Sequence, residues 1–409
     1  MISKHKWTFA TRFRSRAYGW RGTGLATKRL KEAVSEIRRV ARKDPVLAAD
    51  GAVTLMARLW PALQDIDSST GALGNAVYAT LEKLIPILMS APADRNSRTK
   101  WLERLFVALE NDGVQYLSPV EEHWGELCVY PELVAEWVDR LAPVVREVWS
   151  DQDQFSFING DAACLSCLLE LGRFQELNEI LSLRSHSFWP IDRYGAEALA
   201  RQGLTDAAIG YAEARGKDNY DDPYIVEFCE RVLLDADRRD EAYRRYGLRV
   251  MSGNTYLATF RAVTRKYPER DPRQVLIDLI QARGDQGKWF AAAKTAGFLD
   301  IALDCASYGA TEPATLLRAA RDFVASEPRF AAQVSLQAIS DLLAGKGYEP
   351  TPLDLSQACH LFHAAAEAFS ESERADDVLR RVLRDAEAGV SDVRMCAAMH
   401  IHLDRAGSL

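Results

Sequence analysis

Leu168–Leu177 reads LLELGRFQEL, which is an apolar run, a break at Gly172 and a second run that ends on an apolar residue. Leu199–Ala208 repeats this plan as LARQGLTDAA, and Leu233–Ala242 repeats it as LLDADRRDEA. The last residues of the three segments are 31 and 34 residues apart. These intervals are close to the period of about 34 residues that is typical of tetratricopeptide-type repeats. The segments therefore predict successive helical hairpins.

The break residues Gly172, Gly203 and Asp237 support this interpretation. A helix often ends on a residue in the left-handed region, where glycine has no steric penalty and Asp only a small one. The small residues Ala208 and Ala242 then allow two helices to approach closely. Because one hairpin cannot bury both of its faces, each repeat depends on its neighbours. The expected fold is an all-α solenoid of antiparallel helix pairs, a right-handed superhelix similar to tetratricopeptide repeats.

Apolar residues recur at helical spacing along nearly the whole chain, and no segment has the sustained alternation that is typical of a strand. Helices are predicted over residues 26–42, 46–63, 74–89, 98–111, 119–127, 131–149, 255–267, 272–281, 289–296, 299–308, 313–325, 329–343, 353–369, 373–388 and 393–404. We expect three regions: a basic aromatic arm over residues 1–25, a helical region over 26–150, and a repeat region over 151–409 that continues it.

Composition is typical of a soluble protein, with 48% hydrophobic and 27% charged residues in 409. Charged or polar residues interrupt every apolar segment before the roughly 20 residues that a bilayer span needs. The positive amino terminus has no apolar core behind it, so it does not resemble a secretory signal. Seven scattered cysteines indicate free thiols rather than disulfides. The expected location is the cytoplasm.

Charge is distributed unevenly along the chain. Residues 1–43 carry thirteen Lys and Arg against two Glu, a net +11, so the remainder has a net −18. The basic segment could lie on the acidic surface of its own solenoid, with Trp7, Phe13 and Trp20 in grooves between helices and the arginines paired with carboxylates. Alternatively, it could neutralise phosphates and stack on bases. In either case its candidate contact residues for a partner are Arg12, Arg14, Arg16, Trp20 and Arg21.

Motifs for catalysis or metal binding are weak. Cys164 and Cys167 form a single C-x-x-C inside an apolar helical run, which favours a structural role. Near the carboxyl end, two cysteine–histidine pairs have a spacing of four residues, which could place four zinc ligands together if their helices were neighbours. These pairs are Cys359 with His363 and Cys396 with His400. Core packing of the cysteines is the favoured alternative. We expect no enzymatic activity and no cofactor.

Four short segments carry a family resemblance. They are DGVQY at 112–116, GDAACL at 160–165, RRDEAY at 238–243 and KWFAAA at 288–293. With them, the chain after about residue 45 resembles an uncharacterised bacterial family of α-helical, tetratricopeptide-like repeat proteins. Its repeats are similar to the helical region that accompanies SWIM zinc fingers. The finger itself, a C-x-C followed by C-x-H, is absent here, so the resemblance implies the repeat fold and no metal function.

Recognition is therefore the expected function. A helical-repeat groove would bind a protein or peptide as a non-enzymatic interaction or scaffold protein, and the acidic body would favour a basic partner. Aromatic residues expected on the concave face are Tyr194, Tyr211, Tyr243 and Trp289. Packing between repeats is an equally good interpretation of each. The alternative function is a nucleic-acid-associated factor that contacts phosphates through the basic amino-terminal arm.

Overall fold

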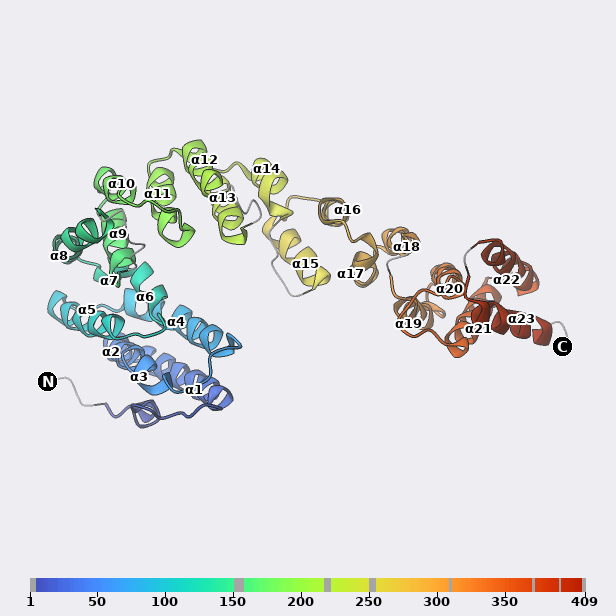
Figure 1. Cartoon of the computed structure of the whole chain (residues 1–409), viewed down its shortest axis with the longest axis horizontal. Helices are drawn as coiled ribbons and strands as arrows, with labels where there is room; N and C mark the ends of the chain where they lie inside the picture. The colour runs from blue at the N-terminus through green and yellow to red at the C-terminus, as the bar shows by residue number, and fades with distance from the viewer. Residues whose placement is uncertain are drawn as a thin grey trace. The chain divides into compact units, whose positions relative to one another are not determined.

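The computed structural model is all-α in the part of the chain that it describes, and no strand occurs there (Figure 1). It describes residues 5–150, 158–216, 222–249, 255–308, 311–369, 372–389 and 391–406, and only the backbone of 372–373 and 405–406. The chain divides into two units, Met1–Tyr220 and Asp221–Leu409. Among the described helices, none combines the length and the apolarity needed to cross a bilayer.

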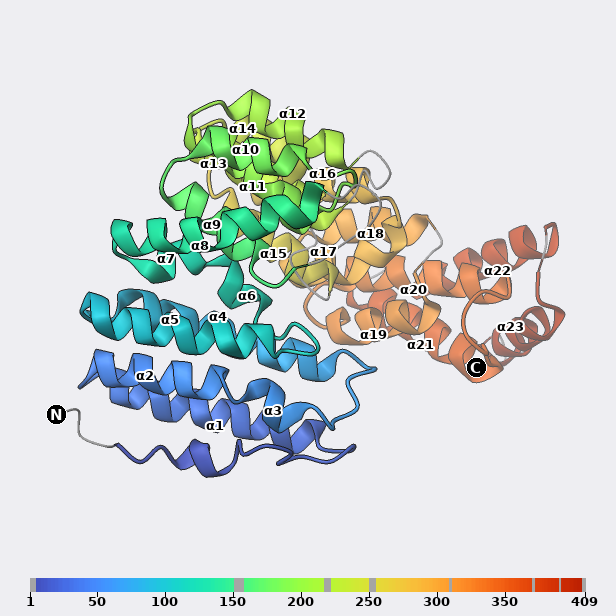
Figure 2. The same cartoon turned by 60° about the vertical axis from the view of Figure 1, so that its left-hand side comes forward.

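Unit 1 is a stack of paired helices. Figure 2 shows the amino-terminal segment, then α1 and α2, then α4 and α5, as successive layers. Its elements are η1 (Thr8–Thr11), α1 (Thr23–Ala41), α2 (Pro45–Met56), α3 (Leu59–Leu63), α4 (Ala72–Ser90), α5 (Arg95–Glu110), α6 (Ser118–Glu122), α7 (Trp124–Cys128), α8 (Pro131–Ser150), α9 (Asp161–Glu170), α10 (Phe174–Ser182), α11 (Trp189–Arg201) and α12 (Thr205–Arg215).

Unit 2 continues the same plan of packed helices, so both units are solenoids of antiparallel pairs. Its elements are α13 (Pro223–Asp235), α14 (Arg239–Ala242), the π-turn η2 (Tyr243–Gly247), α15 (Tyr256–Lys266), α16 (Pro272–Arg283), η3 (Gln286–Trp289), α17 (Phe290–Ala296), α18 (Leu299–Ser307), α19 (Pro313–Phe323), α20 (Pro328–Leu343), α21 (Pro352–Ala368), α22 (Ser372–Glu387) and α23 (Val393–Ala406).

The three predicted hairpin corners are confirmed. Gly172, Gly203 and Asp237 have φ of 68°, 75° and 57°, in the left-handed region. At each corner, the amide of the break residue and the next amide both donate to carbonyls of the preceding turn. After Gly172, for example, the Arg173 amide donates to the Leu168 carbonyl at 2.9 Å. These hydrogen bonds use carbonyls at the helix end that would otherwise lack partners. The same helix-capping arrangement therefore repeats along the chain.

A fourth corner of the same kind was missed by the sequence analysis. Gly297 has φ of 88°, and the Phe298 amide donates to the Ala293 carbonyl at 3.0 Å. Ala302 lies five residues after the break, as Ala208 and Ala242 do in the earlier hairpins. The interval from Ala242 to Ala302 is 60 residues, about two periods, and this gap hid the repeat.

A buried arginine joins three helices of unit 1. Arg98 of α5 is only 2% exposed. Its guanidinium donates to the Leu88 carbonyl at 3.1 Å, the Leu127 carbonyl at 3.0 Å and the Met89 carbonyl at 3.1 Å, and also to the Ala91 carbonyl. These carbonyls lie at the carboxyl ends of α4 and α7, where helix dipoles are negative. Arg98 therefore supplies to two helix ends both hydrogen bonds and compensating charge.

A glycine sets how closely α7 and α9 approach. A Cβ at Gly125 would lie 2.5 Å from the Ser166 carbonyl oxygen and 2.9 Å from its carbonyl carbon. We expect Gly125→Ala to push the helices apart and to lower the free energy of unfolding of unit 1 by about 2 kcal/mol. Urea unfolding followed by tryptophan fluorescence measures this. Gly210→Ala is the matched control, because its Cβ meets no atom within 4 Å. Equal stability of the two variants would contradict the close packing.

Candidate functional site

The basic segment expected as an arm is part of the core of unit 1. The side chains of Trp7, Phe9, Phe13 and Tyr18 are buried, each at most 6% exposed. Trp7 lies so close to Gly51 of α2 that a Cβ there would be 2.3 Å from its ring. Docking of the segment on its own solenoid, the interpretation that the sequence favoured, is confirmed for Trp7 and Phe13.

Backbone and charged contacts fix the same segment. The Arg16 amide donates to the Pro61 carbonyl at 2.7 Å, and the Arg58 guanidinium donates to the Ala10 carbonyl at 2.7 Å. Glu36 of α1 accepts from the amides of Thr8 and Phe9 and from the Thr8 hydroxyl. These contacts extend from Thr8 to Arg16. The segment is therefore a layer of the solenoid.

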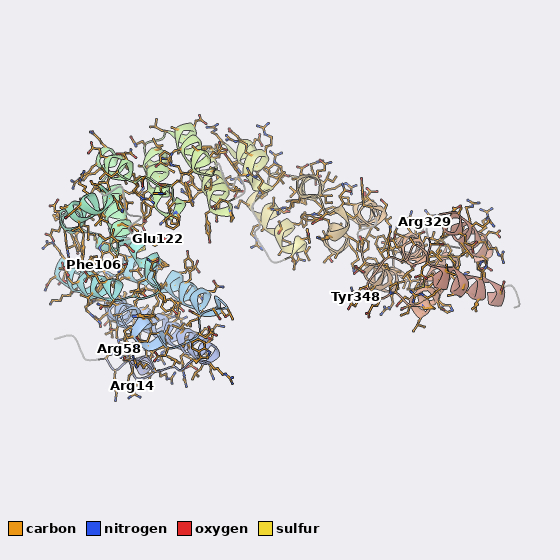
Figure 3. All side chains as sticks on the ribbon, in the orientation of Figure 1. Arg14, Arg58, Phe106, Glu122, Arg329 and Tyr348 are labelled. Carbon is orange, nitrogen blue, oxygen red and sulfur yellow. The ribbon has the colours of Figure 1, made fainter. Side chains whose placement is uncertain are left out.

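The charged and aromatic residues predicted to contact a partner through this segment lie on its outside. Arg12 pairs with Glu32 of α1, and Arg16 lies 3.9 Å from Asp65. Figure 3 shows Arg14 on the outer edge of unit 1.

Trp20 and Arg21 are exposed as well, and Trp20 is 68% exposed. Trp20 therefore does not fill a groove between helices as expected, although its carbonyl accepts a hydrogen bond from the Asp67 amide at 3.0 Å. Its ring remains open to solvent close to the first turn of α1.

The aromatic residues predicted for a concave face are mostly core residues. Tyr194 is 3% exposed, Tyr243 is 2% exposed, and Trp289 is completely buried. The Tyr243 hydroxyl donates to Asp278 at 2.6 Å. Tyr211 is half-buried. Packing is the role that the structure gives Tyr194, Tyr243 and Trp289, which corrects the expectation that they are available to a partner.

Two grooves on unit 1 were not identified from sequence. The first has a volume of about 780 Å³ and lies between the amino-terminal segment and α1. Phe9 and Ala33 contribute apolar surface to it, and Lys28, Lys31 and Arg39 line it with positive charge. The amphipathic pattern of residues 26–42 was the available signal, since it placed basic residues opposite the apolar face.

The second groove has a volume of about 760 Å³ and lies between α2 and α5. Val46, Leu47 and Trp101 give it an apolar floor. The Trp101 indole N–H donates to Asp50 Oδ1 at 3.2 Å, and the Arg104 guanidinium donates to the same oxygen at 2.9 Å. These two hydrogen bonds hold the Trp101 ring and the Arg104 guanidinium in place on Asp50. The groove therefore has an ordered apolar floor next to charged groups.

Cysteine chemistry is disfavoured by the surroundings of the thiols. All seven cysteines are buried. Burial raises the pKa of the Cys164 thiol to about 12, and burial beside Cys128 raises the pKa of the Cys167 thiol as well. The thiolate is the reactive form, so both side chains remain protonated at neutral pH. The C-x-x-C motif therefore serves packing between α7, α8 and α9.

The two cysteine–histidine pairs near the carboxyl end do not converge on a metal. The Cys359 thiol donates to the Met399 sulfur at 3.5 Å, whereas His363 lies 3.3 Å from Asp376. His400 bonds at 2.7 Å to a glutamate of α22. In the part of the chain that the structure describes, no group of three or more His, Cys, Asp or Glu side chains is arranged to hold a metal ion.

Two buried carboxyl groups lie together where α6 meets α9. Burial, reinforced by the nearby Asp161 charge, raises the pKa of Glu121 to about 8. Burial raises the pKa of Asp161 to about 6, although the hydrogen bond from the Ala162 amide and the charge of Arg184 both act to lower this pKa. Glu121 accepts a hydrogen bond from the Gly160 amide, and Asp161 Oδ1 accepts one from the Ala162 amide at 2.6 Å. At pH 7, Glu121 is therefore mainly neutral inside the core.

Comparisons with known proteins give no family. No family model matches the chain, and no curated protein matches it. Among solved structures, it is similar to a circular tandem repeat protein with novel repeat topology and enhanced subunit contact surfaces. The two share 15% sequence identity over 93% of this chain and 90% of that chain, with a TM-score of 0.19. A TM-score this low does not indicate a shared fold. The repeat architecture of this chain is seen in its own helices and corners.

Proposed function

We propose that this chain is a non-enzymatic interaction protein and that the groove between α2 and α5 binds a segment of a partner protein. The observation that carries this proposal is the apolar floor of Val46, Leu47 and Trp101 in a groove of about 760 Å³. Binding sites are concave, mainly apolar and bordered by a few polar groups. The aromatic floor has the character of an interaction hot spot, where a buried ring provides most of the contact energy.

The charges around this groove favour a partner segment with basic residues. Asp44, Asp50 and Glu103 outnumber Lys100 and Arg104 among the lining residues. Residues 44–409 as a whole carry a net charge of −18. An acidic surface attracts a basic partner and suppresses acidic ones. The expected ligand is therefore a peptide segment with one apolar anchor flanked by Lys or Arg.

A peptide display library selected on the full-length protein tests this function. We expect selected peptides to share an apolar anchor beside Lys or Arg, and to bind the Leu47→Arg variant at least about tenfold more weakly, because the new side chain occupies the floor. Val107→Arg is the matched control, since Val107 is an exposed apolar residue of α5 that does not line the groove. Peptides that bind both variants equally would refute this site.

A second candidate function, association with nucleic acid, is favoured by a different observation. The outer face of α1 is basic, and it borders the first groove. The sequence alone suggested that such a contact is made by the basic amino-terminal arm over residues 1–25. Since Trp7 and Phe13 of that segment are buried, deletion of the segment would damage the fold. Any test therefore needs point variants on exposed residues.

A further inference from the structure

The helix α1 separates its apolar and basic residues onto opposite faces. Its buried side chains face the core against α2 and α4, and they are Ala26, Leu30, Ala33, Val34 and Ile37. Its exposed basic side chains are Lys28, Lys31, Arg38 and Arg39, and Arg42 continues the face at the helix end. From residue 28 to residue 42 this face extends for about 21 Å, at 1.5 Å per residue. The result is a line of cations on the outside of unit 1.

Docking of the amino-terminal segment engages the two carboxylates that lie on the same helix as this line. The only two carboxylates in residues 5–43 are Glu32 and Glu36. Glu32 pairs with Arg12 and with Arg29, and Glu36 accepts the hydrogen bonds of Thr8 and Phe9 described above. None of the five basic side chains of the outer face has an ion pair within the described residues. Both acids are thus used to hold the segment, and the outer face remains positive.

The same segment forms the second wall of a groove along this face. The groove of about 780 Å³ is lined on the helix side by Lys28, Lys31 and Arg39 and on the segment side by Arg12. Glu32 and Glu36 line it too, so four cations face two carboxylates and the lining has a net charge of +2. Thr8, Thr27 and Ser35 add hydroxyl oxygens to the lining, of which those of Thr8 and Ser35 donate to Glu36 and to the Lys31 carbonyl. Positive charge together with hydrogen-bonding hydroxyls is what an extended phosphate backbone requires.

We propose that the groove between the amino-terminal segment and α1 binds single-stranded nucleic acid through its phosphates. Proteins that bind single strands combine a basic groove that follows the backbone with aromatic rings that stack on bases. Trp20 offers such a ring, because it is 68% exposed and lies three residues before the start of α1, next to the exposed Arg21. The contact is thus on α1 and its flank rather than on a free tail.

A membrane surface fits these observations less well. Helices that bind membranes place their apolar face among the lipids, whereas the apolar face of α1 is already buried in unit 1. The outward face between Lys28 and Arg42 presents basic residues and Ser35, without an apolar side chain to insert. Electrostatic attraction to anionic lipid would remain, so vesicles belong in the test.

Fluorescence anisotropy with a labelled 20-nucleotide oligouridylate and the full-length protein tests the proposal between 50 and 300 mM salt. We expect binding that weakens steeply with salt. In K28Q/K31Q/R39Q, the loss of three phosphate contacts should weaken binding by about 100-fold at low salt and reduce the salt slope by about 2. The triple variant R261Q/R265Q/R329Q is the control, because it removes the same charge from exposed arginines of unit 2. It should bind as wild type does.

Several results would overturn the proposal: no binding by wild-type protein, equal weakening in both triple variants, or tighter binding of the matching duplex. Cosedimentation with vesicles of phosphatidylserine and phosphatidylcholine, without oligonucleotide binding, would assign the groove to membranes instead. Circular dichroism confirms that the variants are folded. The Leu47→Arg variant should keep its oligonucleotide affinity, so failure of this proposal and failure of the α2–α5 groove are distinguishable.

Discussion

Replacement of Arg98 by Met should lower the free energy of unfolding of unit 1 by about 4 kcal/mol. The variant leaves the carbonyls of Leu88, Met89, Ala91 and Leu127 without the donor that joins them. The Ala91 carbonyl keeps the Ala93 amide as a donor at 2.8 Å. A buried polar group left without a partner costs about 1–3 kcal/mol, and partial access of water reduces the sum over the other three carbonyls. Burial also lowers the pKa of Arg98, but the four carbonyls still favour a charged donor at neutral pH.

Urea unfolding followed by tryptophan fluorescence is the measurement, because eight of the nine tryptophans precede residue 220. Arg98→Lys should recover part of the loss, since one ammonium keeps the charge but has fewer donors in a different geometry. Arg95→Met is the control, as Arg95 lies on the same helix and pairs with Glu136 at the surface. Its effect should stay within about 0.5 kcal/mol. Equal effects of Arg98→Met and Arg95→Met would contradict the role of Arg98.

The second large effect concerns pH and Glu121. The pKa of this carboxyl is about 8 in the folded chain against an ordinary 4.5, so the folded state holds the proton over a range where the unfolded state releases it. Its contribution to stability is therefore complete below about pH 4.5 and is lost as pH rises through about 8. Glu121→Gln stays neutral at every pH. The stability advantage of this variant over wild type should be larger by about 4 kcal/mol at pH 8.5 than at pH 5.

Urea titrations at pH 5.0, 7.0 and 8.5 measure this difference. Glu122→Gln is the control, because Glu122 pairs with Arg193 at 2.9 Å and is about one-third exposed. It should leave the pH dependence unchanged. Asp161, whose pKa is about 6, should act in the same direction as Glu121 over a lower range of pH. A Glu121→Gln variant with the pH slope of wild type would show that the buried carboxyl does not hold its proton.

Much of the fold was predictable from sequence because its determinants are local. The spacing of apolar residues predicted the helices. Gly172, Gly203 and Asp237 predicted the corners, because the residue type alone indicates which positions tolerate the left-handed conformation. Helix ends were less accurate. The single run predicted over residues 46–63 is divided into α2 and α3, and the run over 119–127 is divided into α6 and α7.

The features that were not predictable depend on distant contacts. Trp7 is buried because Gly51 leaves room for its ring, whereas Trp20, with similar neighbours in sequence, has no such glycine and is exposed. Arg98 resembles any other arginine on a helix until the ends of α4 and α7 meet around it. Glu121 lies beside Glu122 in the first turn of α6, and acids at a helix start are typically solvated groups that complement the helix dipole. The burial of Glu121 follows from the packing of α9, which no local pattern encodes.

The groove proposed for nucleic acid has the amino-terminal segment as one wall, so it depends on this segment being a layer of unit 1 rather than a free tail. Hydrogen exchange followed by mass spectrometry on the full-length protein tests this claim most directly. The amides of Thr8, Phe9 and Arg16 bond to Glu36 and Pro61, so peptides covering residues 5–18 should be protected nearly as well as peptides of α2. Exchange of these peptides at the rate of an unstructured chain, with α2 still protected, would contradict the account.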